Sequence, residues 1–177
     1  MKPDVEALET AYSALTAPPR RSGRVDLVVL RLGGGEHATP ESVEITVDDG
    51  LVGDRWTAEK DPERGAQVTL MMSSVAKLLT GDQPLHIPGD NFIVDIDIGT
   101  EAMPVGTRVA IGTAVLEISD EPHTGCAKFS ERLGSAALRW VNHADFKSRR
   151  GRGVNCRVIS PGTVAVGDTI SVIEAES

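Results

Sequence analysis

The chain has 177 residues, of which 40% are hydrophobic and 25% charged, and its formal net charge is −8 with an isoelectric point near 5.0. This length suits one globular domain, while the acidic balance and the scarcity of aromatic residues argue against nucleic acid as a partner. No apolar run approaches the ~20 residues of a membrane-spanning helix, and the acidic start lacks a signal-peptide pattern. We therefore expect a cytoplasmic protein, with no membrane partner, whose two cysteines stay reduced.

The first 23 residues are predicted to form a helical extension and a linker. Apolar residues recur at helical spacing over 4–16, and the sequence "APPRRSG" that follows is typical of a connection between elements. A frayed tail with weak helical bias is the alternative interpretation. The body of the protein is predicted to be a single domain over residues 24–177.

Short β-branched runs separated by glycine and proline dominate that domain. They predict strands over 24–32, 42–47, 66–73, 91–98, 153–160 and 168–174, and a hairpin around Gly112-Thr113 in "TRVAIGTAVLEIS". Helices are expected over 73–81 and, as a short pair with Ser135 capping the second, after Cys126. Many short strands with few helices indicate a mainly β protein, a closed or nearly closed β-barrel.

Cys126, in "EPHTGCAKFS", is the strongest candidate for chemistry. It precedes a predicted helix, where exposed N–H groups favour a thiolate, and Lys128 and a protonated His123 would lower its pKa further. A thiolate can ligate a metal, carry a persulfide or attack an electrophile. Free cysteine is also among the most buried residue types, so a packing role is the alternative.

Cys156 lies inside a β-run with apolar neighbours and is interpreted as a core residue. A Cys126–Cys156 redox pair requires the fold to bring the two thiols together. The spacing of His123 and Cys126 matches part of a zinc site, but the remaining potential ligands are scattered and a closed zinc site needs four. Zinc is therefore not favoured.

Three polar turns are candidates for ligand binding. Asp54 and Arg55 lie in "GLVGDRW", where an arginine fork could bind an anion or simply pair with the aspartate. Asn91 in "IPGDN" could hydrogen-bond a heterocycle or satisfy the turn. The glycine-rich stretch 31–40 matches neither phosphate-binding motif and is expected to be a flexible loop.

A basic cluster over residues 147–152 stands out against the acidic background. It comprises Lys147, Arg149, Arg150 and Arg152. Such a cluster suggests an anionic ligand nearby, or else a solvated loop that protects a sheet edge.

Taken together, these segments resemble the MOSC family, named for the C-terminal domain of molybdenum cofactor sulfurase. The matching elements are "LVGDRW", "QVTLMM", "PGDNFIVDIDI", "MPVGTRVAIGTAVLEIS" and the segment from "PHTGCAKFS" to "GDTISV", in this order. The resemblance runs from about Arg24 to about Ile173. One departure is Gly125, which stands where many relatives have a proline before the cysteine.

The resemblance implies a barrel like the small barrel domain of pyruvate kinase and a molybdenum–pterin cofactor. It implies that Cys126 is the catalytic residue, which ligates the metal or carries sulfur as a persulfide. By position, Asp54, Arg55, Asn91, His123 and Lys128 would line the site. Our own inference from the basic cluster adds Arg149, Arg150 and Arg152 as holders of the cofactor's phosphate.

The implied activity is sulfur transfer to the metal or reduction of a nitrogen–oxygen bond in a small molecule. The sequence contains no pyridoxal-phosphate desulfurase domain, so a cysteine desulfurase would act in trans, as would an electron-donor protein for a reduction. The rival hypothesis is a non-catalytic barrel that binds an anion or a partner protein, with a structural Cys126. A third hypothesis is a thiol redox sensor without metal.

Overall fold

The computed structural model describes residues 4–174, and its centre is a closed seven-stranded barrel. The strand order is β1-β12-β8-β9-β10-β6-β7, and neighbouring strands are antiparallel except for the parallel pair β6–β7. These strands are β1 (Ser22–Val28), β6 (Val68–Met72), β7 (Phe92–Asp95), β8 (Arg108–Ile111), β9 (Ala114–Ile118), β10 (Val154–Ser160) and β12 (Thr169–Val172). The predicted mainly β barrel is confirmed.

The strand burial patterns follow from the sequence. In β9 the buried and half-buried residues alternate, as expected for a strand with one face on the core. All five residues of β6 are buried, because this strand has covered surfaces on both faces. The β8–β9 hairpin turns at Gly112, whose φ of 55° suits glycine. A Cβ at Gly112 would lie only 2.3 Å from the carbonyl oxygen of Thr163, so the position has no room for a side chain.

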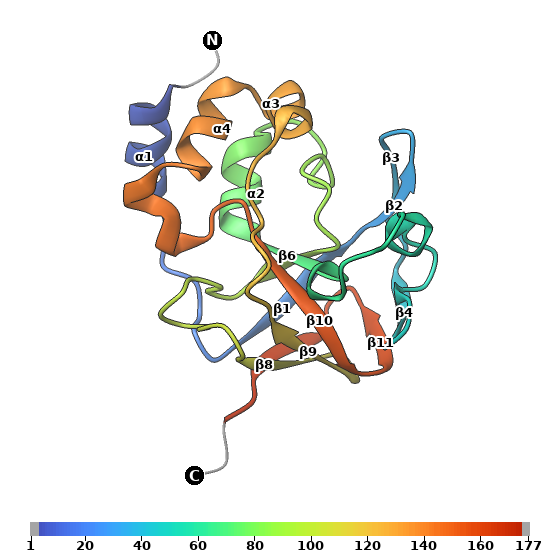
Figure 1. Cartoon of the computed structure of the whole chain (residues 1–177). Helices are drawn as coiled ribbons and strands as arrows, with labels where there is room; N and C mark the ends of the chain where they lie inside the picture. Colours follow the sequence, from blue (N-terminus) through green and yellow to red (C-terminus); the bar gives the residue numbers. More distant parts are fainter. Residues whose placement is uncertain (1–3, 175–177) are drawn as a thin grey trace.

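Two small sheets flank the barrel. One has the order β11-β4-β5, from β11 (Gly162–Ala165), β4 (Ser42–Thr46) and β5 (Gly50–Leu51). The other is the hairpin of β2 (Leu30–Gly33) and β3 (Glu36–Ala38), which projects on one side of the molecule (Figure 1). The predicted strand 24–32 is thus two strands in different sheets, and β11 forms between the predicted strands 153–160 and 168–174, where the sequence predicted no strand.

The four α-helices gather at one end of the molecule (Figure 1). They are α1 (Val5–Ser13), α2 (Ser73–Thr80), α3 (Ala127–Leu133) and α4 (Ser135–Val141). The chain also forms short 3-10 turns, η1 (Arg55–Ala58), η2 (Arg64–Ala66) and η3 (Ala144–Arg149). Gly134, not Ser135, is the N-cap of α4, and Ser135 makes no capping hydrogen bond. The prediction of a Ser135 cap is therefore wrong.

Helix α1 packs against α4. Leu8 is buried, the Tyr12 and Trp140 rings pack in a tilted arrangement with centroids 5.6 Å apart, and the Trp140 indole donates a hydrogen bond to Glu9. Two further hydrogen bonds of 2.6 and 2.7 Å run from Arg149 to the Glu9 carboxylate. The division into an extension (1–23) and a barrel domain (24–177) stays a prediction, although the extension's helix is firmly docked.

Candidate functional site

Cys126 is the N-cap residue of α3, with extended backbone angles (φ −128°, ψ −178°), and it is exposed. The irregular segment that leads to it is held by two asparagines. The side chain of Asn155 donates hydrogen bonds to the carbonyl oxygens of Glu121 and Pro122, and Asn142 bonds both the N–H and the carbonyl of Gly125. The thiol is therefore presented at the surface by a fixed chain segment.

The environment of Cys126 favours its thiolate. No capping hydrogen bond to the sulfur is formed, but the N–H groups of Phe129 and Lys128 at the start of α3 lower the thiol pKa below its usual value. Partial burial acts in the opposite direction, and the charges of Arg152 and Lys128 reinforce the lowering. Such a thiol is suited to ligate a soft metal or to carry sulfur.

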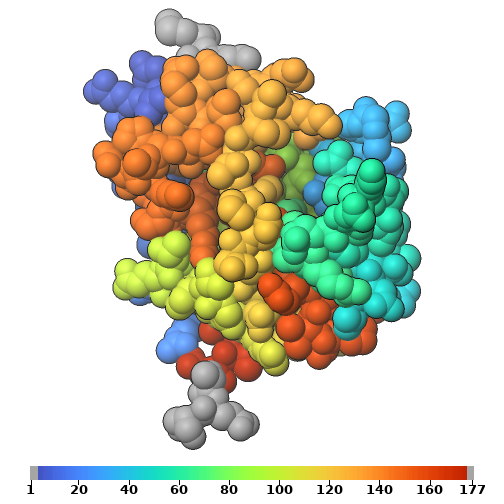
Figure 2. Space-filling view, viewed as in Figure 1, coloured from blue at the N-terminus to red at the C-terminus, as the bar shows by residue number. Residues whose placement is uncertain are grey.

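Cys126 opens into a cavity of about 210 Å³, which we call the cysteine pocket. In the space-filling view a hollow lies between the yellow-orange segment that leads into α3 and the blue-green region of β2–β5 (Figure 2). Five cationic side chains and one carboxylate line it: Arg31, Arg55, Lys128, Arg132, Arg152 and Glu36. This balance fits an anionic ligand, in a chain whose net charge is −8.

One side of the cysteine pocket rests on a buried carboxylate, Asp54. Its two oxygens accept hydrogen bonds from the Arg31 guanidinium at 3.1 and 2.7 Å and from the Asn91 amide at 3.1 Å. Asn91 is fully buried, and its own oxygen accepts from Thr69. Burial opposes the ionisation of Asp54, but Arg31 outweighs it and the pKa lies below its ordinary value. Asp54 and Asn91 thus fix Arg31 from behind the pocket wall.

A second buried carboxylate, Asp90, lies under the other wall. It is completely buried, and it bonds His123 Nε2 at 2.7 Å and Arg152 Nη1 at 2.5 Å. Burial alone would raise the pKa of Asp90, but the charges of Arg152 and His123 lower it. Burial also lowers the pKa of His123, and the charge of Asp90 raises it by a smaller amount. The imidazole is therefore neutral at neutral pH.

Two arginine nitrogens at the cysteine pocket have no protein partner. The Nε atoms of Arg55 and Arg152 are buried and make no hydrogen bond within residues 4–174. An unpaired buried donor costs free energy, and a bound anion would supply the missing acceptor. The residues of this pocket therefore fit an anionic cofactor that offers oxygen acceptors to arginine and a soft metal to the thiolate.

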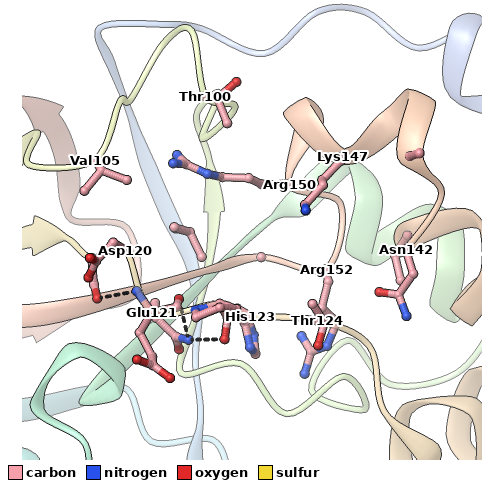
Figure 3. A pocket seen from close by; sticks show the side chains of 17 residues that line it. Thr100, Val105, Asp120, Glu121, His123, Thr124, Asn142, Lys147, Arg150 and Arg152 are labelled. Carbon is pink, nitrogen blue, oxygen red and sulfur yellow. Dashed lines mark hydrogen bonds between the residues drawn. The ribbon is translucent and has the colours of Figure 1, made fainter.

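A larger cavity of about 590 Å³ adjoins the cysteine pocket, and we call it the loop pocket. Lys147 and Arg150 line one side, and Asp120 and Glu121 line another (Figure 3). The two pockets share His123, Thr124 and Arg152 in their linings. Ligands in the two pockets would therefore be separated by only a few side chains.

The basic cluster is divided by the fold. Arg149 is committed to Glu9 and lines neither the cysteine pocket nor the loop pocket. Arg150 faces the loop pocket but donates its Nη1 to the carbonyl oxygens of Ile98 and Met103. Only Arg152 contributes to both pockets.

Arg31, Arg132, His37 and Asp90 were not among the residues predicted for the site. Arg31 and His37 lie in the segment interpreted as a flexible loop, which forms the β2–β3 hairpin instead. Arg132 follows Cys126 by almost two turns of α3. Asp90 directly precedes Asn91, so the "PGDN" turn was already a candidate for the site. The pairing of Asp90 with His123 could not be predicted, because the two residues are 33 positions apart.

Two features are absent from the described residues. Within residues 4–174 no three His, Cys, Asp or Glu side chains are grouped as they would be around a metal ion. No helix in this range has the length and apolar character required to cross a bilayer.

Several solved structures share the fold. The YuaD protein from Bacillus subtilis superimposes with a TM-score of 0.65 at 18% identity, covering 88% of this chain and 97% of that one. YiiM from Escherichia coli gives 0.57 at 15% identity (87% and 71% covered), and YiiM from Geobacillus stearothermophilus gives 0.55 at 13% (86% and 75%). At these identities the likeness concerns the fold.

The comparison with curated proteins found no match. The comparison with family models is decisive, because the MOSC domain model matches residues 69–171, more than half of the chain. The matched range includes Cys126, His123 and Arg152. This family is associated with the molybdenum cofactor. The chain therefore belongs to the MOSC domain family.

Proposed function

We propose that this protein binds a molybdenum–pterin cofactor in the cysteine pocket, with the thiolate of Cys126 as a ligand of the metal or as a sulfur carrier. The observation that carries the proposal is that an exposed thiol with a lowered pKa, Cys126, lines a pocket rich in cationic side chains. The cofactor, when bound, supplies a metal centre that can accept sulfur or transfer oxygen and electrons.

The side chains of the pocket have distinct roles in this proposal. Arg55, Lys128, Arg132 and Arg152 bind the anionic groups of the cofactor, and the unpaired Nε atoms of Arg55 and Arg152 gain acceptors. Asp54 and Asn91 hold Arg31 in place without facing the ligand themselves. The proposal omits Arg149, because its guanidinium is paired with Glu9.

The loop pocket extends the space for ligands. Pockets that hold drug-sized ligands have volumes of about 300–1,000 Å³, so the cysteine pocket alone is smaller than a whole pterin cofactor requires. The two pockets together reach this range. Lys147 and Arg150 could then bind a phosphate on the far side of the wall formed by His123 and Arg152.

The reaction would be sulfur transfer to the metal or reduction of an N-oxygenated small molecule. Sulfur transfer needs a donor such as a cysteine desulfurase, which carries its own pyridoxal phosphate, and reduction needs an electron-donor protein. A structural role for Cys126, as in the rival hypothesis of a non-catalytic binding barrel, is disfavoured because the residue is exposed rather than packed.

The test is molybdenum content. The protein would be purified under reducing, anaerobic conditions from cells that make molybdenum cofactor, and molybdenum per chain would be measured for the wild type, Cys126→Ser and Cys156→Ser. We expect near-stoichiometric metal in the wild type and in Cys156→Ser, and its loss in Cys126→Ser. Equal metal in all three proteins would overturn ligation by Cys126, and metal in none would overturn tight cofactor binding.

A further inference from the structure

Asp90 lies beneath the wall that separates the cysteine pocket from the loop pocket. Its side chain is completely buried, and each of its carboxylate oxygens has one charged or polar partner. Oδ1 bonds His123 and Oδ2 bonds Arg152. Both of these partners line both pockets, and Figure 3 shows them at the loop pocket, so one buried carboxylate orients two of the three side chains that the pockets share.

The pairing determines where the proton of His123 resides. An ionised carboxylate only accepts hydrogen bonds, so Nε2 of the neutral ring carries the proton and Nδ1 keeps its lone pair. The side chain of His123 is 16% exposed, and within residues 4–174 its Nδ1 makes no hydrogen bond and is not buried. The free lone pair is therefore accessible from the pockets.

The backbone around the pair is shaped for this contact. Gly153, with φ of 115°, lies against both side chains. A Cβ there would come within 3.1 Å of Asp90 Oδ1 and of His123 Cδ2, and within 2.5 Å of the Leu70 carbonyl oxygen. A residue with a side chain at this position would separate β10 from the Asp90–His123 pair.

We propose that Asp90 is a positioning residue that holds His123 as the Nε2–H tautomer and presents Nδ1 as a proton acceptor at the junction of the two pockets. The proposal rests on the proposed function in one respect, namely that the molecule served by His123 is bound in these pockets.

The proton transfer balances within the site. An N–H or O–H group of a bound molecule gives its proton to Nδ1, and the electron pair stays on the ligand atom. Asp90 stabilises the imidazolium that forms, and the cationic side chains of the cysteine pocket stabilise the anion left behind. The proton returns by the same path when the product is protonated. The other charged groups that act on the ring are Arg152 and Arg31, which both disfavour the imidazolium.

The substitution Asp90→Asn tests this tautomer directly. Arg152 fixes the orientation of the new amide, because a guanidinium can only donate hydrogen bonds. Arg152 will bond the amide oxygen of the new asparagine, which turns the amide NH₂ toward His123. Nε2 must then accept, and the ring proton moves to Nδ1. We expect the tautomer of His123 to reverse although the side chain keeps its size.

Nitrogen-15 NMR of histidine-labelled, metal-free protein at pH 8 would measure this directly. The signals of His123 are assigned by their loss in His123→Gln. In the wild type we expect a protonated Nε2 and a bare Nδ1, and in Asp90→Asn the two nitrogens exchange their shifts. Asp54→Asn is the matched control, since it removes a charge from the other buried carboxylate and should leave the tautomer of His123 unchanged.

Acylation by diethyl pyrocarbonate tests whether Nδ1 is accessible, since the reagent attacks an unprotonated ring nitrogen. Mass spectrometry would follow His123, with the more exposed His143 as internal reference. We expect His123 to react in the wild type and to be slowed at least several-fold in Asp90→Asn, where the unprotonated nitrogen faces the buried amide.

A protonated Nδ1 in the wild type, an unchanged tautomer in Asp90→Asn, or an unreactive His123 in the wild type would each overturn the proposal. If Asp90→Asn fails to fold, the two wild-type measurements still decide it. Because these readouts use metal-free protein, failure of molybdenum binding in the earlier test leaves them intact, and their failure leaves that test intact.

Discussion

The two cysteines of this protein lie in opposite environments. Cys126 stands at the exposed start of α3, where N–H groups and cations lower its pKa, and buried carboxylates support the arginines around it. Cys156 is fully buried in β10 between β6 and β9, and burial raises its pKa to about 12. The same side chain is therefore set up for chemistry in one region and for packing in the other.

The largest expected difference is in thiol reactivity. At pH 7.5 iodoacetamide should alkylate Cys126 in the folded protein at least ~1000-fold faster than Cys156, because only Cys126 combines exposure with a favoured thiolate. Mass spectrometry of the two cysteine-containing peptides over time measures both rates. Unfolding in urea should make the rates similar, and similar rates in the native protein would contradict the comparison.

The Cys126 region should depend strongly on its buried charges. Asp54→Ala removes the acceptor of Arg31 and of the Asn91 amide, which leaves a mostly buried guanidinium without its partner. We expect a loss of about 3–5 kcal/mol in the free energy of unfolding, measured by urea titration. Asp54→Asn, which keeps an acceptor oxygen, should lose less. Equal stability of Asp54→Ala and wild type would show that the pair is dispensable.

Serine substitutions should affect the stability of the protein more at Cys156 than at Cys126, the reverse of the order expected for thiol reactivity. Cys156→Ser places a hydroxyl in the apolar core and should cost about 1–3 kcal/mol. Cys126→Ser changes an exposed residue and should stay within about 0.5 kcal/mol of the wild type. Urea titrations of the two variants check this, and a larger loss for Cys126→Ser would favour the structural role of that thiol.

A modest effect is expected for the attachment of α1 beside the site. Arg149 lowers the pKa of Glu9 from 4.5 to about 2, so the ionised pair stabilises the fold above pH 4.5 and this contribution disappears as the pH falls toward 2. Because the pair is partly exposed, we expect Glu9→Gln to lose only about 1–2 kcal/mol at pH 7.

The measurement is unfolding of both proteins across this pH range. The difference between wild type and Glu9→Gln should shrink steadily between pH 4.5 and pH 2. A difference that does not change with pH would mean that Glu9 acts through packing or its bond to Trp140 rather than through its charge.

Elements with strong local patterns could be predicted accurately. Alternation in β9 and the Gly112-Thr113 turn identified the β8–β9 hairpin, because strand alternation and turn chemistry depend on neighbours in the chain. The small elements β3, β5 and β11 were missed because each has only two to four residues and is stabilised by a strand far away in the sequence or across a tight turn.

In the candidate site, too, some features could be predicted from the sequence and others depend on the tertiary structure. The sequence by itself determined a β-barrel and an unusual cysteine before a helix, since both are written in local residue types and spacing. Only the tertiary structure decided that Arg149 serves α1, that Asp54 and Asn91 lie behind Arg31, and that Asp90 joins His123 to Arg152. These pairings involve residues 23 to 140 positions apart, and a charged residue's role depends on which partner the folded chain places within hydrogen-bonding distance.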